Sequence, residues 1–230
     1  MTLGEFLEEL GEGSCANLIS VFNDGKVKDS KRKKVIRTVN TALDKLYKDF
    51  YLEEDSVYIA LQESQTRYEI TKEHVMTEEE CQAQGNYNKY LYVGDDFRDV
   101  MSIRRVSTDD GQTLPLNHID NPLSIMTPRF DTIFVPLDLD CKALLVTYRC
   151  FPKHLENDED EITIPRTLYD CLDAYVTYLL HKQLNTKDSE TVGQTYLQIY
   201  NDAVQAILAD GTIRDDYVDD CVKFTERGFE

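Results

Sequence analysis

The chain has 230 residues, of which 41% are hydrophobic, and a formal net charge of -18 from 43 acidic and 25 basic side chains. This length and apolar content allow a buried core in one domain or two small ones, and they exclude disorder throughout. The acidic balance argues against a protein that binds duplex nucleic acid by neutralising its phosphates. The alternative reading is that the excess acid only keeps the surface soluble.

The sequence carries no recognisable targeting or membrane signal. It lacks a run of about 18 apolar residues, and its N-terminal stretch is not that of a signal peptide. Six cysteines are present, but no two have CxxC spacing, and several fall on predicted apolar faces where free cysteine acts as a small hydrophobic residue. We therefore expect a protein of a reducing cytosol with no membrane partner.

Two short apolar segments near the N-terminus predict two short helices joined by a turn. The first covers residues 3–10 and the second residues 16–22, with glycines at 11 and 13 between them. Ser14 is the expected N-cap of the second helix. The triplet Asn23-Asp24-Gly25 ends this region.

A block of basic residues follows in an otherwise acidic chain: Lys26, Lys28, Lys31, Arg32, Lys33, Lys34 and Arg37. It leads into an apolar pattern with spacings of three and four, which predicts a helix from about Val35 to Tyr51. Because the helix macrodipole disfavours cations in the first turns, the block is not placed for helix stability. We interpret Lys28, Lys31, Arg32, Lys33, Lys34 and Arg37 as a docking cluster for an acidic partner, the alternative being a solvated helix face.

The middle of the chain changes to the alternation that is typical of strands. Seven segments follow this pattern: 57–61, 66–71, 89–93, 100–106, 113–119, 132–135 and 143–150. Asp110-Gly111 lies between two of them, and this dipeptide favours a hairpin turn because it tolerates positive φ. Seven short strands predict an antiparallel sandwich or small barrel.

Helical patterns return after an acidic segment. Residues 156–161 hold five acids and no apolar residue, which predicts a solvated, extended linker. Pro165 suits the first turn of the next helix, where its missing N–H costs nothing. A second helix starts near Asp188 or Ser189 and ends at Gly211, and the two helices are expected to pack as an antiparallel hairpin.

The helical patterns thus stand at the two ends of the chain, and each is too one-sided to be stable alone in water. We predict an α+β protein in which N-terminal helices (1–55) and a C-terminal helical hairpin (153–211) form one helical bundle. An antiparallel β-sandwich or barrel (56–152) is inserted between them, and a tail (212–230) follows.

Catalytic and cofactor motifs are missing. The nucleotide, zinc, hydrolase and calcium signatures do not occur, so we expect a protein that is not an enzyme and has no cofactor. Cys150 and His154 have a spacing that a metal ion could use, but no second pair completes a site. The acidic pairs Asp95/Asp96, Asp109/Asp110 and Asp138/Asp140 could hold a cation for hydrolysis, although turns use aspartate far more often.

One series of short motifs resembles the head-to-tail adaptor proteins of tailed bacteriophages. The series is Asp110-Gly111, Leu114-Pro115-Leu116-Asn117, Ser124-Ile125, Asp131-Thr132-Ile133, Val135-Pro136, Val146-Thr147-Tyr148-Arg149 and Ile162-Thr163-Ile164-Pro165. Residues 38–47 resemble the adaptor helix that precedes the β domain. The resemblance therefore covers about residues 35–210.

This resemblance implies a structural virion protein of the neck, assembled in the host cytoplasm. Such adaptors form a dodecameric ring that joins the portal protein to tail or nozzle proteins, and genomic DNA passes through the ring without specific binding. The C-terminal segment commonly reaches into the portal, which implies portal-binding anchors at Tyr217, Val218, Val222, Phe224 and Phe229. The alternatives for this tail are a disordered end or a helix folded back on its own bundle.

A second function stays open from the residues themselves. A cytosolic interaction module could use the β domain to bind a peptide or a small ligand, since seven strands can form a pocket. Ligand-dependent stabilisation of a monomer distinguishes that function from a ring-forming adaptor.

Overall fold

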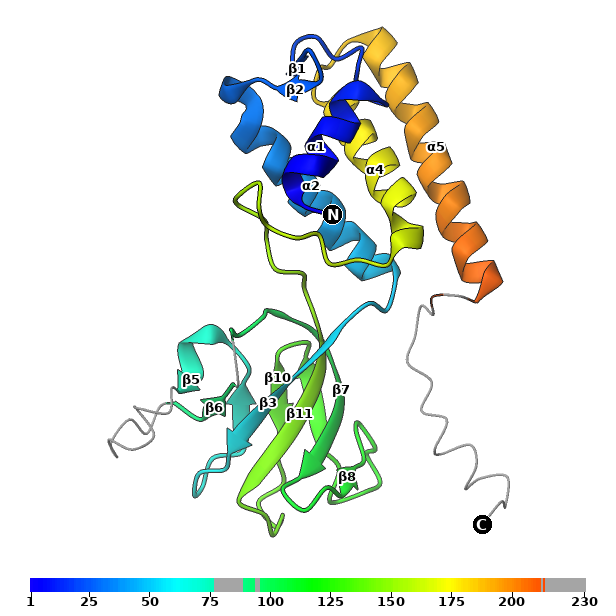
Figure 1. Ribbon diagram of the computed structural model, residues 1–230. Helices are drawn as coiled ribbons and strands as arrows, with labels where there is room; N and C mark the ends of the chain where they lie inside the picture. The colour runs from blue at the N-terminus through cyan, green and yellow to red at the C-terminus, as the bar shows by residue number, and fades with distance from the viewer. Residues whose placement is uncertain (77–88, 94–95, 212, 214–230) are drawn as a thin grey trace. The chain divides into compact units, whose positions relative to one another are not determined.

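The computed structural model describes residues 1–76, 89–93, 96–211 and 213, and it confirms an α+β protein. The chain divides into two compact units. One unit combines Met1–Leu52 with Pro152–Glu230 and contains the α-helices, while the other is Glu53–Phe151 and contains nine strands in the described residues. Both units can be followed by colour in Figure 1.

The helical unit contains α1 (Leu3–Glu12), α2 (Asp29–Asp49), α4 (Tyr169–Lys182) and α5 (Lys187–Asp210). Helix α4 packs against both α2 and α5 (Figure 1). Their apolar stripes share one hydrophobic cluster with α1, in which Leu3, Val39, Leu46, Leu172 and Val176 are essentially inaccessible to solvent. Because α2 and α4 are far apart in sequence, this core needs both ends of the chain.

The ends of these helices follow ordinary capping chemistry. Thr2 and Glu5 form a capping box at the start of α1, in which each side chain accepts the other residue's backbone N–H. Thr186 caps α5 at its start, and Gly211 ends it in the left-handed conformation (φ 69°). Pro165 precedes a short 3₁₀ turn, η2 (Arg166–Leu168), that leads into α4. The predicted helical hairpin and its end at Gly211 therefore match the observed elements.

The predicted second N-terminal helix over 16–22 is wrong. The chain there forms turns and then a two-stranded hairpin, β1 (Phe22–Asn23) and β2 (Lys26–Val27). Asp24 and Gly25 both have positive φ (48° and 76°), which is the geometry of a two-residue hairpin turn. Ser14 is not a helix N-cap, because its hydroxyl contacts Asp173 and Thr177 on α4.

The acidic segment 156–161 is largely exposed, as its charge predicts, but it is not a free linker. Its backbone carbonyls accept the first N–H groups of α1, from Leu3 to Asp160 (2.9 Å) and from Gly4 to Asp158 (3.0 Å). These N–H groups have no partner inside their own helix, so the segment satisfies them. The carboxylate of Asp160 accepts backbone N–H groups from Glu156 and Asn157, and these bonds lower its pKa.

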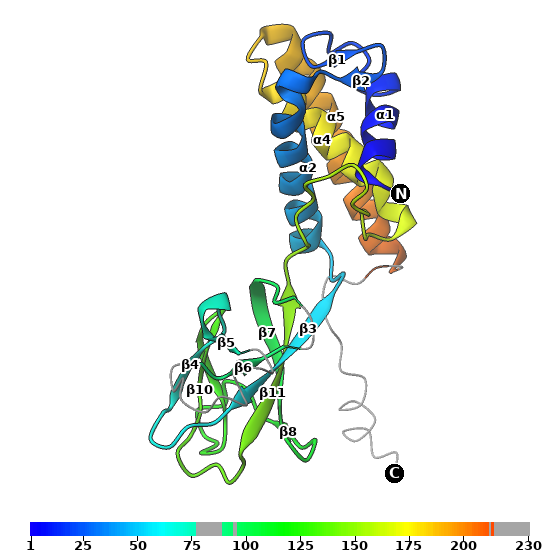
Figure 2. The same cartoon turned by 60° about the vertical axis from the view of Figure 1, so that its left-hand side comes forward.

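The β unit contains two sheets. The six-stranded sheet has the order β5-β6-β3-β11-β7-β8 and the three-stranded sheet the order β4-β10-β9. Figure 2 shows these strands from a second side. The bounds are β3 (Glu54–Ala60), β4 (Arg67–Glu69), β5 (Val75–Met76), β6 (Leu91–Tyr92), β7 (Val100–Thr108), β8 (Thr113–Leu114), β9 (Met126–Arg129), β10 (Thr132–Phe134) and β11 (Ala143–Cys150), with a 3₁₀ turn η1 (Lys72–His74). Apolar side chains from both sheets share a single core.

The strand predictions differ in how well they fit. Strand β11 covers the predicted residues 143–150, and its alternate residues from Leu144 to Cys150 are fully buried. The predicted strand 113–119 stops at Leu114, because Pro115 follows and Asn117 has positive φ (56°). Strand β9 was not predicted, because it contains Pro128 and proline is uncommon within strands. The proline is tolerated here because β9 lies at the edge of its sheet.

Candidate functional site

The basic block occupies the start of α2, as predicted, but its members have different surroundings. Arg32 forms an ion pair with Asp158 in the acidic segment that caps α1. The ammonium of Lys28 donates to the carbonyl of Ile19 (2.6 Å). Both residues therefore help to hold the helical unit together, and they are only partly exposed.

The remaining cations of the cluster point into solvent. Lys31, Lys33, Lys34 and Arg37 are exposed, and none of them forms an ion pair within the described part of the chain. Lys28 is the N-cap of α2 and makes no capping hydrogen bond through its side chain. The start of α2 thus gathers positive charge at the helix end where the macrodipole disfavours it.

A partly buried polar network ties the turn after α1 to α4. The hydroxyl of Ser14 donates to Asp173 (2.7 Å) and lies 2.9 Å from the hydroxyl of Thr177. The thiol of Cys15 lies 3.4 Å from the same threonine hydroxyl, and burial raises the pKa of that thiol to about 11. A thiol held neutral in this way is a poor nucleophile, and Cys15 is fully buried.

Asp173 makes this network sensitive to pH. Its pKa is raised chiefly because burial penalises the carboxylate, with Asp170 and Glu9 adding repulsion, while the Ser14 hydrogen bond acts in the opposite direction. The folded chain therefore holds this proton more tightly than the unfolded chain. Such a group favours folding most at low pH, and this contribution is lost as the pH rises through the folded pKa.

We therefore expect Asp173→Asn to be more stable than the wild type near neutral pH, because the amide cannot ionise. The difference should shrink as the pH falls toward the ordinary carboxyl pKa of about 4. Urea unfolding across this pH range measures it, with Asp202→Asn on the exposed face of α5 as the control that changes the same charge. A difference independent of pH would show that Asp173 is not the titrating group.

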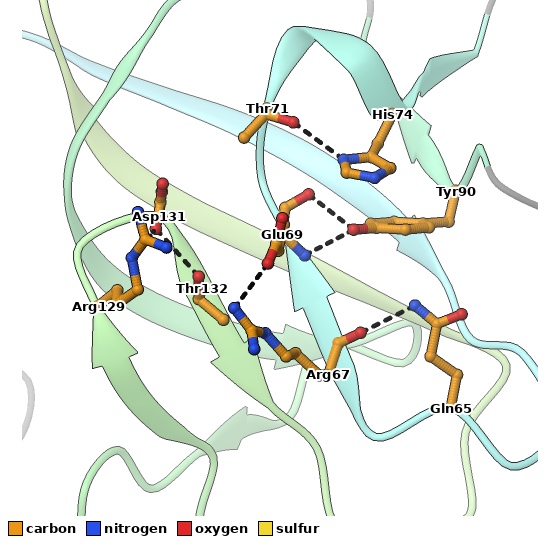
Figure 3. Close-up of polar contacts among 9 residues, drawn as sticks. All are labelled: Gln65, Arg67, Glu69, Thr71, His74, Tyr90, Arg129, Asp131 and Thr132. Carbon is orange, nitrogen blue, oxygen red and sulfur yellow. Dashed lines mark hydrogen bonds and ion pairs between the residues drawn. The ribbon is translucent and has the colours of Figure 1, made fainter.

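In the β unit, the hydroxyl of Tyr90 connects the two sheets (Figure 3). It donates to the carbonyl of Glu69 on β4 (2.8 Å) and accepts the backbone N–H of the same residue (2.5 Å). The ring of Tyr90 stacks on His74, with centroids 4.8 Å apart, and the Thr71 hydroxyl lies 2.9 Å from His74 Nδ1. Glu69 lies opposite Thr132 of β10, and because the Tyr90 hydroxyl occupies both of its backbone groups, no further strand can bond to β4 at that residue.

The charges around Tyr90 are compensated locally (Figure 3). Arg67 pairs with Glu69 at 2.7 Å, and Arg129 lies 3.4 Å from Asp131. These four charges therefore cancel, and the cluster presents no excess charge to a ligand. Its contacts hold the two sheets together. Sequence reasoning missed it, since no local pattern connects a tyrosine with a backbone 21 residues away.

The motif residues of the resemblance hold a loop in place. Asn117 donates its side-chain N–H to the hydroxyl of Thr127 and accepts the backbone N–H of Thr127, both at 2.8 Å. Ser124 accepts the backbone N–H of His118 (2.9 Å) and donates to the carbonyl of Pro115 (3.1 Å). These motif residues therefore fix the conformation of the loop between β8 and β9.

Beside this loop is a shallow hollow of about 300 Å³, lined by Pro115, His118, Ile119, Asp120 and Asn121. The side chain of Ile119 is 88% exposed. An open apolar side chain next to a hollow offers a contact point for a small ligand or a peptide.

The residues considered for metal binding or hydrolysis do not assemble a site within the described ranges. No group of three or more potential metal ligands occurs there. Asp110 accepts a hydrogen bond from Thr108 in the turn between β7 and β8, the ordinary use of aspartate in turns, and this bond lowers its pKa. Cys150 is buried in β11, whereas His154 lies 3.3 Å from Asp44 in the helical unit.

The predicted anchors Tyr217, Val218, Val222, Phe224 and Phe229 lie outside the described residues, and so does Asp95 of the paired aspartates. None of the described helices has the length and apolar character needed to cross a membrane. The chain matches no model of a known protein family, and a search of curated proteins finds no match to it.

Proposed function

We propose that this chain is a head-to-tail adaptor of a tailed bacteriophage, a structural protein of the virion neck and not an enzyme. Its helical bundle carries an inserted β-sandwich. Copies form a dodecameric ring between the portal protein and the tail or nozzle proteins, and genomic DNA passes through the ring without specific binding. Assembly takes place in the host cytoplasm.

The observation that carries this proposal is the order of the elements. Helices from the two ends of the chain make one compact unit, and the strands between them make another. The resemblance of the Leu114–Asn117 and Ile162–Pro165 motifs leads to the same order of helix, β domain and helical hairpin. Adaptors need interfaces and no reactive centre, which agrees with the burial of Cys15, Cys150 and Cys171 and with the turn role of Asp110.

The net charge of -18 supports the same proposal physically. Repeated around a closed ring, it gives a strongly negative annulus. A lumen with the sign of DNA lets the genome slide without adhering.

Electron microscopy tests the proposal on the purified chain, alone and mixed with the portal protein of the same virus. We expect rings bound to the portal and coaxial with it. A chain that stays monomeric in the presence of portal rings would contradict the adaptor function.

Removing the tail after Gly211 is expected to weaken binding to portal rings by at least about tenfold, because the apolar anchors supply the contact. Cosedimentation with portal rings measures the binding. The matched control keeps the full length and replaces only Asp215 and Asp216 with asparagine, which leaves the anchors intact. Undiminished binding of the truncated chain would remove the anchor role of the tail.

The second candidate is an interaction module whose β domain binds a peptide or a small ligand. The hollow beside the exposed Ile119 favours it. A monomer whose melting temperature rises with an added ligand, and falls back in Ile119→Ser, would support this function over the adaptor.

A further inference from the structure

Helix α1 presents a face of four glutamates to solvent. Glu5, Glu8, Glu9 and Glu12 are all exposed, while Leu3, Phe6, Leu7 and Leu10 are buried. The four glutamates have the spacing i, i+3, i+4 and i+7, which places them along one side of a helix. We call Glu5, Glu8, Glu9 and Glu12 the acidic face of α1.

Helix α2 presents a face of the opposite sign. Its exposed cations are Lys31, Lys33, Lys34 and Arg37, and we call them the basic face of α2. At about 1.5 Å per residue, this face spans about 9 Å and the acidic face of α1 about 10 Å. Two faces of similar length and opposite charge can therefore lie against each other.

Both faces carry charge where their own helix disfavours it. The cations occupy the first turns of α2, near the positive end of its macrodipole, with only Asp29 as an acid in the first turn. Glu9 and Glu12 occupy the negative end of α1, whose last turn holds no basic residue. Since no ion pair joins the two faces inside the described part of the chain, the fold leaves both charges uncompensated.

The two faces lie on separate helices of the helical unit. Figure 2 shows α1 and α2 apart, on either side of α4. Two different, complementary surfaces of one subunit make a heterologous contact, in which each copy binds the next one. Such contacts form a ring where the rotation between copies closes, and an open filament where it does not.

We propose that the basic face of α2 docks on the acidic face of α1 of a second copy of this chain. This inference rests on the proposed function, because it names the surfaces that join neighbouring subunits of the ring. The net charge of -18 makes most approaches of two copies repulsive, so this oriented contact also selects the correct geometry. It accounts for the only run of positive charge in an acidic chain.

Two charge-reversed variants test the contact. Lys33→Glu with Arg37→Glu cancels the net charge of the basic face, and Glu8→Lys with Glu12→Lys cancels that of the acidic face; Glu5 stays because it caps α1. Each variant alone is expected to self-associate at least about tenfold more weakly than the wild type. An equimolar mixture should recover association, because the unaltered acidic face of one variant meets the unaltered basic face of the other.

Sedimentation velocity at low and high salt is the measurement, and wild-type association should weaken as salt screens the charges. Carbodiimide coupling of a mixture of light and ¹⁵N-labelled chains should also link the lysines of the basic face of α2 in one copy to Glu8, Glu9 or Glu12 of another copy. The control, Lys72→Glu with Lys142→Glu, alters two exposed lysines of the β unit by the same net charge and should behave like the wild type. Circular dichroism checks that each variant folds.

Three results would overturn the docking proposal: coupling only within one chain, a mixture that fails to associate, or a basic face that couples only to the portal protein. Rings that still form on the portal with either reversed variant would remove this contact and leave the adaptor function standing. A wild-type chain that forms no ring on the portal would instead remove the adaptor function.

Discussion

Replacing Gly11 with alanine is expected to destabilise the helical unit by about 3 kcal/mol or more, through a backbone clash. A Cβ at this position would lie 2.0 Å from the carbonyl oxygen of Gly25 and 2.8 Å from the ring of Phe22. Gly11 lies within α1, where alanine is otherwise the better helix former. The loss must therefore come from forcing α1 away from the β1–β2 hairpin.

Urea unfolding followed by far-UV circular dichroism measures this effect. Gly111→Ala is the control, because its Cβ would meet nothing within 4 Å and only the positive φ of 88° is strained. That change should cost about 1 kcal/mol. A Gly11→Ala protein no less stable than Gly111→Ala would mean that α1 and the hairpin do not approach as described.

Replacing Asn40 with alanine is expected to lower the free energy of unfolding by about 3 kcal/mol. The buried amide of Asn40 donates to the carbonyl of Leu155 (3.0 Å) and accepts the N–H of Leu155 (2.9 Å). Alanine would leave both backbone groups buried without a partner, and each such group costs about 1–3 kcal/mol. The effect should extend to the acidic segment after Leu155, which caps α1.

The neighbouring Thr41→Ala provides the matched control. Its exposed hydroxyl only donates to the carbonyl of Arg37 one turn earlier, so its loss should change stability by less than about 0.5 kcal/mol. Amide hydrogen exchange at Leu3 and Gly4 reports on the acidic segment. Unchanged protection there in Asn40→Ala would show that Leu155 does not position this segment.

Long periodic elements could be predicted from the sequence because their signal repeats. The stripe of α2 and the helical hairpin follow a spacing of three and four, and β11 alternates over eight residues. The two-residue strands of the β1–β2 hairpin carry no period. Asp24-Gly25 contains the same turn signal as Asp110-Gly111, but short flanking strands left it unrecognised.

The prediction for the acidic segment 156–161 was incomplete for a different reason. Its side chains predict an extended, solvated linker, but its backbone carbonyls make the contacts with α1. Composition says nothing about where backbone groups bond. The two hydrogen bonds between the Tyr90 hydroxyl and the backbone of Glu69 could not be predicted for the same reason.

Only part of the candidate site could be predicted from the sequence. The basic cluster stands out by composition, but only the structure separates Lys28 and Arg32, which hold the unit together, from the exposed Lys31, Lys33, Lys34 and Arg37. The acidic face of α1 was readable from its spacing. Its relation to α2 needed the placement of both helices in one unit.

The assembly of the helical unit from both ends of the chain bears on how the protein folds during its synthesis. Helix α2 leaves the ribosome long before α4, which covers its apolar stripe. At translation rates of about 5–20 residues per second, that stripe waits on the order of ten seconds for its partner. Residues 53–151 are complete earlier and can fold first. Slow synthesis between α2 and α4 therefore exposes α2 to aggregation or to chaperones.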